Sequence, residues 1–194
     1  FPDLTFYDTD IQLALRHAAL YNTFPLARCK MTVDQDDLAH DIEVLDSPWD
    51  LDAPRPPLRI LRMQPDRDPN RSEPRHLLLN FERYSYRLAL EPARPLLVNL
   101  RAILKRHDPD LLLTSWGDTW LLPRLLELSK EHGLPLPLNR DHKFGAAHRP
   151  ERTYFSYGQV IYRGQQVHLF GRWHLDGRNV MLWDDYQLEG SLEV

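Results

Sequence analysis

The sequence has one cysteine, few glycines and no long apolar run. Because Cys29 is alone among 194 residues, an intrachain disulfide and a cysteine-only zinc site are excluded, and we expect a small buried apolar residue. With eight glycines and no glycine-rich loop, the sequence shows no phosphate-binding motif of that kind. We find no apolar run of membrane-spanning length and no signal peptide. We therefore expect a soluble, cytoplasmic protein without membrane contact.

The chain also lacks the excess positive charge that is typical of polycationic nucleic-acid binders. Its 24 Lys and Arg residues are outnumbered by 28 Asp and Glu residues, and the net charge is −4. A local basic groove is still compatible with this composition, because arginine greatly outnumbers lysine and suits bidentate phosphate contacts. The nine histidines form no ligand-spaced pair on one predicted element, which argues against a zinc site.

The length and the proline pattern predict two domains. At 194 residues and 42% hydrophobic content, the chain can bury one good core with a smaller appendage. Residues 46–57 are rich in proline and aspartate, have little periodicity and indicate a linker. We predict a small β-rich domain over residues 1–55 and a larger domain over residues 56–194. The chain begins with Phe1 rather than methionine, so we expect a fragment of a longer protein or an engineered chain.

Residues 108–123 organise the larger domain. The apolar run 111–113 is bounded by Asp-Pro and by Ser-Trp-Gly, which predicts a buried strand. The leucines that follow have nearly helical spacing and predict a helix that ends before Gly133. Open α/β sheets usually bind ligands at such strand-to-helix turns. The periodicity alone fits an ordinary strand–helix unit without chemistry equally well.

The remaining pattern predicts an α/β protein with a mixed sheet and flanking helices. Residues 58–63 should form a central strand beside residues 111–114. The other predicted helices cover residues 11–21 and 92–107. Further strands are predicted at residues 26–33, 42–45, 76–80, 84–90 and 172–176. Residues 134–150 should form a loop, and residues 154–162 should pair with 166–170 in a hairpin across Arg163-Gly164. A further element is predicted from residue 179 to 185.

Several stretches resemble family B DNA polymerases, in the order in which that family has them. Residues 108–112 followed by 116–123 are similar to the second exonuclease motif, where a strand ends in Asn, an aromatic-Asp pair follows, and Leu-Pro begins the helix. The similarity spans nearly the whole chain and is greatest to the bacterial type-II branch. The supporting stretches are residues 7–11, Pro25, 56–61, 134–141 and 171–177.

This resemblance implies a fold and partners. It implies an RNase H-like exonuclease domain over residues 56–194, preceded by the small β-rich domain. It also implies DNA as a partner, either single-stranded or as a primer-template, and the remainder of a parent polymerase chain that acts in DNA replication or repair.

The residues at the metal-binding positions depart from the family. Proofreading exonucleases of this family hold two metal ions with carboxylates, which stabilise the attacking and leaving oxygens. In the best alignment the first motif, Asp-Ile-Glu, falls on Gln64-Pro65-Asp66. The Asn and Asp of the second motif fall on Trp116 and Leu121. Two ligand carboxylates are thus replaced by Gln64 and Leu121, so we expect no catalytic residue, no bound metal and no other cofactor.

A literal copy of the first motif occurs elsewhere. Asp41-Ile42-Glu43 spells it, but these residues lie before the proline-rich boundary, so we interpret them as part of a solvated strand. Using Asp41 as a ligand would still leave Leu121 apolar. By the same resemblance, the third motif would lie beyond Val194.

Other residues have two interpretations each. Asp118 could cap the following helix, or it could join Asp66 and Asp176 in a rearranged metal site. Trp116 and Trp120 could stack unpaired bases at the mouth of a cleft, or pack in the core. The candidate nucleic-acid contacts are these two tryptophans and Arg62.

Three functions remain open from the sequence. The first is an exonuclease-like, catalytically inactive portion of a family B DNA polymerase or polymerase-like protein, which binds nucleic acid weakly or is structural. The second is an active 3′–5′ exonuclease that uses Asp66, Asp118 and Asp176 with magnesium or manganese. The third is a protein-interaction module without DNA contact.

Overall fold

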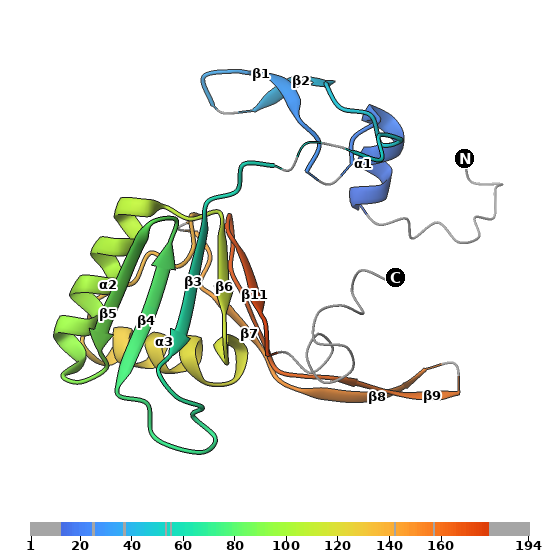
Figure 1. Cartoon of the computed structure of the whole chain (residues 1–194). Coiled ribbons are helices and arrows are strands. Elements are labelled where there is room, and N and C mark those ends of the chain that lie inside the picture. The colour runs from blue at the N-terminus through green and yellow to red at the C-terminus, as the bar shows by residue number, and fades with distance from the viewer. Residues whose placement is uncertain are drawn as a thin grey trace. The chain divides into compact units, whose positions relative to one another are not determined.

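The computed structural model describes residues 13–24, 26–36, 38–52, 54, 56–141, 143–156 and 158–178. The chain divides into two compact units, Phe1–Pro57 and Leu58–Val194 (Figure 1). Within the described ranges, no helix is both long enough and apolar enough to cross a membrane.

The first unit contains helix α1 (Leu13–Tyr21) and an antiparallel pair of strands, β1 (Cys29–Val33) and β2 (Ala39–Val44). Asp41 and Glu43 are exposed on β2, which confirms the solvated-strand interpretation. Cys29 is exposed, so the expectation that it is buried was wrong. All five residues of β1 are exposed, because two strands alone cannot cover both of their faces.

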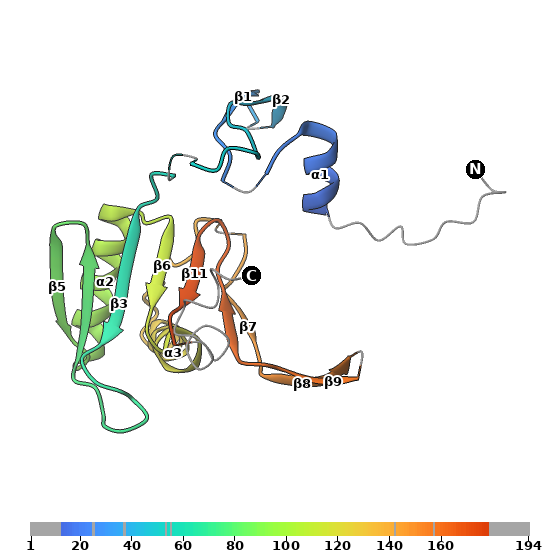
Figure 2. The ribbon, with the colours of Figure 1, turned by 45° about the vertical axis from the view of Figure 1, so that its right-hand side comes forward.

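The second unit is built on a mixed five-stranded sheet. Its strand order is β11-β6-β3-β4-β5, in which β11, β6 and β3 pair in parallel and β4 pairs antiparallel with both β3 and β5 (Figures 1 and 2). Pairing of Ile60 with Leu111 through Met63 with Thr114 confirms that the first strand of this unit is central and lies beside the 111–114 strand. The strands are β3 (Ile60–Pro65), β4 (His76–Phe81), β5 (Tyr84–Ala89), β6 (Leu111–Thr114) and β11 (Trp173–Asp176).

Helices α2 (Ala93–His107) and α3 (Leu122–Glu131) cover one face of this sheet (Figure 2). Leucines at helical spacing on both helices pack against alternate residues of the strands and form the core. Basic side chains in the last turn of α2 interact favourably with the partial negative charge at the carboxyl end of the helix. Asp108 ends the helix in a left-handed conformation. The structure is therefore α/β with a mixed sheet and flanking helices, as predicted.

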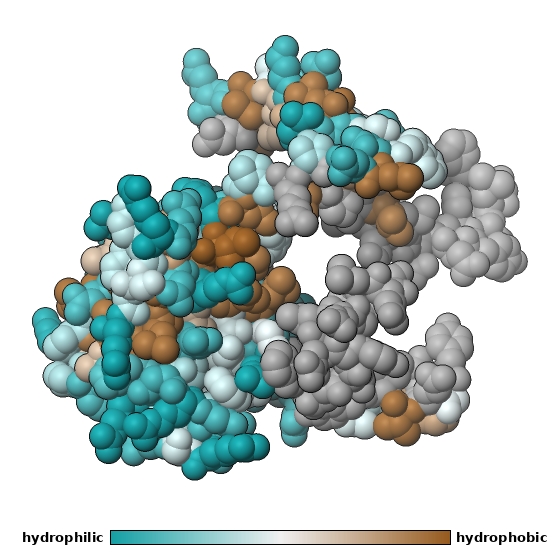
Figure 3. Space-filling model, viewed as in Figure 1, coloured by the Kyte–Doolittle hydropathy of each residue, from teal (hydrophilic) through white to brown (hydrophobic). Residues whose placement is uncertain are grey.

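The second face of the sheet is open in the described part of the chain. It carries the alternate strand residues, among which Arg62, Asn80 and Ser85 form one exposed row across β3, β4 and β5. The view of Figure 3 looks onto this face, where hydrophobic residues gather over β3, β6 and β11. Trp173 and Leu175, both about half exposed, belong to this face of β11.

The segment between α3 and β11 differs from the prediction. The predicted loop contains β7 (Ala147–Arg149), which pairs with β10 (Gln166–His168). The predicted hairpin of 154–162 with 166–170 was wrong, because β8 (Arg152–Ser156) pairs instead with β9 (Gln159–Arg163). Gly158, with φ +82°, provides the turn that the prediction placed at Gly164. The element predicted from residue 179 onward lies outside the described residues.

Candidate functional site

The three parallel strands end at one edge of the sheet, and a pocket of about 300 Å³ lies there. One wall comes from β3, the floor from the end of β6, and the other wall from the residues that follow β11. Both charged side chains that line it are arginines, and within the described residues no acidic side chain lines it. Its polar lining consists of Arg62, Gln64, Thr114, Ser115, Gly177 and Arg178.

A close approach of three elements shapes the floor of this pocket. After β6 the chain turns at Trp116, in a left-handed conformation, and Gly117 begins one π-helical turn (Gly117–Leu121) that leads into α3. A Cβ atom at Gly117 would collide with the Thr114 side chain and would lie 2.5 Å from His174 Nε2. Only glycine therefore lets the helix start so close to β6 and β11.

Thr114, His174 and Asp118 form a buried chain of polar contacts beneath the floor. Thr114 Oγ1 lies 2.8 Å from His174 Nε2, and His174 Nδ1 lies 3.5 Å from Asp118 Oδ1. The shorter contact of Nδ1 is to the carbonyl oxygen of Val167 at 2.9 Å, so Nδ1 carries a proton and donates it there. Because Thr114 is only 2% exposed, this chain ties strands together and does not present a nucleophile.

Asp118 anchors a neighbouring strand. Its Oδ1 accepts the backbone N–H of Val167 at 2.7 Å, and its own backbone N–H donates to Asp176 Oδ2 at 3.0 Å. No side chain caps the turn that contains Asp118, so the predicted capping role was wrong. The helical turn already begins at Gly117, and the Asp118 carboxylate is buried against β10.

Asp176 is buried at the end of β11 and holds the turn that carries Arg178. Its Oδ1 accepts the backbone N–H of Arg178 at 3.0 Å, while Oδ2 accepts that of Asp118. Burial raises the pKa of Asp176, and the nearby Asp118 carboxylate adds to the increase. Asp118 and Asp176 are therefore brought together, although both are 5% exposed or less and neither lines the pocket.

Asp66 does not join them. Its Oδ1 accepts the backbone N–H groups of Arg75 and His76, at 2.9 and 3.2 Å, and its Oδ2 lies 3.1 Å from His76 Nδ1. Burial acts to raise the pKa of Asp66, but these hydrogen bonds outweigh it and lower the pKa to about 2. Asp66 thus closes the loop between β3 and β4. In the described part of the chain, no group of three His, Cys, Asp or Glu residues is arranged to hold a metal ion.

The two replaced motif positions lie in different environments. Gln64 is exposed and lines the pocket, whereas Leu121 is 1% exposed and belongs to the core. A carboxylate at position 121 would therefore face leucines, unless the start of α3 were turned.

The two candidate tryptophans are also separated. The guanidinium of Arg178 lies over the Trp116 ring, 4.9 Å from its centroid, which places Trp116 beside the pocket. Trp120 packs against the core and lines a different pocket of about 500 Å³, between the β3–β4 loop and α3. The sequence prediction did not include Arg178. The sequence offered one signal for Arg178, because it follows a predicted strand. Residues that follow the parallel strands of a sheet meet at the same end of that sheet.

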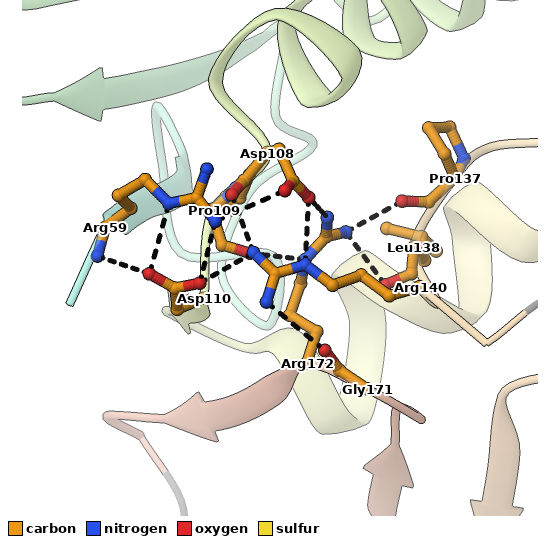
Figure 4. Close-up of polar contacts among 9 residues, drawn as sticks. All are labelled: Arg59, Asp108, Pro109, Asp110, Pro137, Leu138, Arg140, Gly171 and Arg172. Atoms are coloured by element: carbon orange, nitrogen blue, oxygen red, sulfur yellow. Dashed lines mark hydrogen bonds and ion pairs between the residues drawn. The ribbon is translucent and has the colours of Figure 1, made fainter. Parts of the chain in front are cut away.

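A network of arginines and aspartates lies at the opposite, amino ends of the parallel strands (Figure 4). Arg172, whose side chain is 2% exposed, donates to the carbonyl oxygens of Pro109, Pro137 and Leu138 at 2.6–2.9 Å. Arg140 Nη2 donates a hydrogen bond to Asp110 Oδ1 at 2.6 Å.

Asp110 connects this network to Arg59, the residue that precedes β3. Arg59 donates to Asp110 through its backbone N–H, at 2.8 Å, and through its guanidinium. The hydrogen bond from the Arg59 side chain lowers the pKa of Asp110 well below its usual range, and the Arg140 hydrogen bond adds to this. The network fixes β3, β6 and the residues before β11 relative to one another, and so determines how their other ends meet at the pocket.

Comparison with known proteins gives a structural likeness. No protein-family model matches the chain, and no curated protein matches it in sequence. The chain is similar to the structure of the family B DNA polymerase from the hyperthermophilic archaeon Pyrobaculum calidifontis, with a TM-score of 0.57 and 19% sequence identity. The similarity covers 93% of this chain and 23% of the polymerase, so the chain spans about a quarter of that polymerase's length. At this identity the likeness shows the fold alone.

Proposed function

We propose that this chain is an exonuclease-like portion of a family B DNA polymerase or polymerase-like protein, and that it binds single-stranded DNA without cleaving it. The larger unit is then an RNase H-like domain. The mixed five-stranded sheet and the likeness to the Pyrobaculum calidifontis polymerase support this assignment. The partners would be DNA, bound weakly, and the remainder of the parent polymerase chain.

The observation that carries the proposal is the charge of the pocket. Two-metal phosphodiester hydrolysis needs several carboxylates around a pair of cations. Here Arg62 and Arg178 line the position where the parallel strands end, and Gln64 offers only a neutral amide. Two guanidinium groups disfavour a divalent cation and favour an anion. The geometry therefore supports binding of a phosphate chain more than its hydrolysis.

The active-exonuclease alternative would require a different arrangement of the remaining acids. Asp66 would have to leave the Arg75 and His76 N–H groups, and Asp118 would have to release Val167. Each release leaves backbone donors without a partner, which costs about 1–3 kcal/mol per buried group.

A digestion assay tests this proposal. The purified chain is incubated with a 3′-labelled and a 5′-labelled single-stranded oligonucleotide in manganese, with and without chelator. We expect no chelator-sensitive shortening, because none of the described residues that line the pocket carries a carboxylate. Shortening from the 3′ end that chelator stops, and that Asp118→Ala abolishes, would show an active exonuclease. An active proofreading polymerase in the same buffer is the positive control.

A further inference from the structure

Positive charge is concentrated in residues 82–107, which contain β5 and α2. This stretch has six Lys and Arg residues and two Glu residues, whereas the whole chain has a net charge of −4. None of the six forms an ion pair with another described residue. Arg101 is half-buried and the other five are exposed; the six are Arg83, Arg87, Arg94, Arg101, Lys105 and Arg106. The surface of these two elements therefore favours an anionic partner.

Strand β5 forms one edge of the five-stranded sheet, and its outer side pairs with no described strand (Figure 2). Just after β5, the Leu90 N–H donates to the Arg75 carbonyl oxygen at 2.9 Å, and the hydrogen-bonded pairs of β4 with β5 alternate from there. Every second residue of β5 thus bonds to β4. The N–H and C=O groups of the remaining three residues, Ser85, Arg87 and Ala89, point to the open side.

Cationic side chains stand on both sides of this edge. Arg87 is exposed on the open face of the sheet, where its Nη2 lies 3.2 Å from His76 Nδ1 and leaves the other guanidinium N–H groups to a ligand. On the helix side, the Arg106 guanidinium lies 5.3 Å from the centroid of the Tyr84 ring, which brings the basic last turn of α2 beside β5. Arg83, in the turn between β4 and β5, lies 5.4 Å from the same centroid. A strand added here would have positive charge next to both of its faces.

Charge on an edge strand selects among possible partners. Charged side chains on an edge oppose pairing with a neutral or basic strand, because they would lose water or meet like charge. An acidic strand replaces this repulsion by attraction, while main-chain hydrogen bonds to the edge supply affinity. A phosphodiester backbone offers acceptors but no N–H donors, so it would leave the outward carbonyl groups of β5 without a protein partner. The open edge therefore favours a polypeptide over a nucleic acid.

We propose that the outer edge of β5 binds an acidic, extended polypeptide segment, which adds a sixth strand to the sheet and places carboxylates beside Arg87 and Arg106. This surface is separate from the pocket at the carboxyl ends of the parallel strands, so the inference goes beyond the proposed function.

Binding of a fluorescent peptide that alternates glutamate with valine tests the charge requirement. Fluorescence anisotropy with the whole chain should show saturable binding that weakens as salt is raised. Arg87→Glu and Arg106→Glu should each weaken binding on the order of tenfold, because each replaces an attraction by a repulsion. Arg71→Glu is the matched control, since it makes the same change of charge on a side chain 88% exposed in the loop between β3 and β4. It should alter the affinity by about twofold or less.

Main-chain pairing is tested separately from charge. A peptide of the same sequence in which every backbone nitrogen is methylated keeps its carboxylates but has no N–H donor, and it should bind on the order of tenfold more weakly. Within the chain, Ala89→Pro removes an outward N–H at an exposed position, where an edge strand tolerates proline, and should weaken binding roughly two- to tenfold. Circular dichroism checks that each variant folds.

Three results would overturn the proposal. Equal affinity for the methylated and unmethylated peptides would mean adhesion by charge alone. Peptide binding that is absent, or that neither arginine reversal weakens, would remove the site. An oligothymidylate that binds more tightly than the peptide, and that both reversals weaken, would make this surface a nucleic-acid site instead.

Discussion

At the scale of single residues, arginine has two roles at opposite ends of the same three strands. At the amino ends, Arg59, Arg140 and Arg172 are bonded to aspartates and carbonyl oxygens (Figure 4). At the carboxyl ends, Arg62 and Arg178 line a pocket to which no described residue contributes a carboxylate. The first set stabilises the fold, and the second lies where the parallel strands end.

The buried arginine should contribute most to stability. Arg172→Ala leaves the Pro109, Pro137 and Leu138 carbonyls and the Asp108 carboxylate without this donor. We expect the free energy of unfolding to fall by about 3–5 kcal/mol, as when one partner of a buried ion pair is removed. Urea denaturation measures the change. Arg59→Ala is the matched control, with a side chain 45% exposed, and should cost about 1 kcal/mol or less. Equal losses would contradict the assigned roles.

The Asp66 carboxylate predicts a pH effect on stability. Its pKa is about 2 in the fold, against 3.8 for an ordinary aspartate. A depressed folded pKa stabilises the fold above the ordinary value, and this stabilisation is lost as pH falls from about 4 towards 2. In Asp66→Asn, the decline of the unfolding free energy over this range should be shallower than in the original chain. Parallel declines in the two proteins would mean that Asp66 does not interact as described.

At the scale of elements, the sequence predicted those whose periodicity was strong. The alternation in β3, β4 and β5 and the leucine spacing of α2 give the observed elements within two residues. The hairpin of β8 with β9 was mispredicted, because Gly158 and Gly164 are both suitable turn residues and local pattern does not choose between them. The pairing of β10 with β7 depends on long-range burial, since Val167 is 2% exposed.

The same limit applies to the candidate site. Gln64 was identified from its alignment with the first exonuclease motif and Arg62 as a candidate nucleic-acid contact, and both line the pocket. A cap was one of the two interpretations of Asp118, and the sequence did not reveal its partner, Val167, which is 49 residues away. Arg178 was not identified, although it follows a predicted strand, because that strand was not predicted to pair with residues 111–114.

The junction between β6 and α3 depends on one glycine. Gly117→Ala would place a methyl group against Thr114 and His174, in a buried network that has no room for it. We expect a loss of about 1–3 kcal/mol in the free energy of unfolding, as for other overpacked sites. Gly145→Ala is the control, since beyond its two chain neighbours no described residue lies within 4 Å of its added Cβ, and it should change stability by about 0.5 kcal/mol or less. A neutral Gly117→Ala would mean that the junction can relax.

At the scale of the whole molecule, the fold and the chemistry of the pocket point in different directions. The fold resembles part of a polymerase chain, with 93% of this chain covered. The pocket, however, offers positive charge where hydrolysis by metal ions requires negative charge. The function proposed above reconciles the two: a nuclease-like scaffold would hold a nucleic-acid strand through arginines.

The most direct test of this account measures how metal affects strand binding. A labelled single-stranded oligonucleotide is titrated with the chain in manganese and, separately, in chelator, and the same samples are then run on a denaturing gel. If arginines hold the strand, the two dissociation constants should agree within about twofold and the oligonucleotide should stay full length. Manganese-dependent tightening together with shortening from the 3′ end would contradict the account.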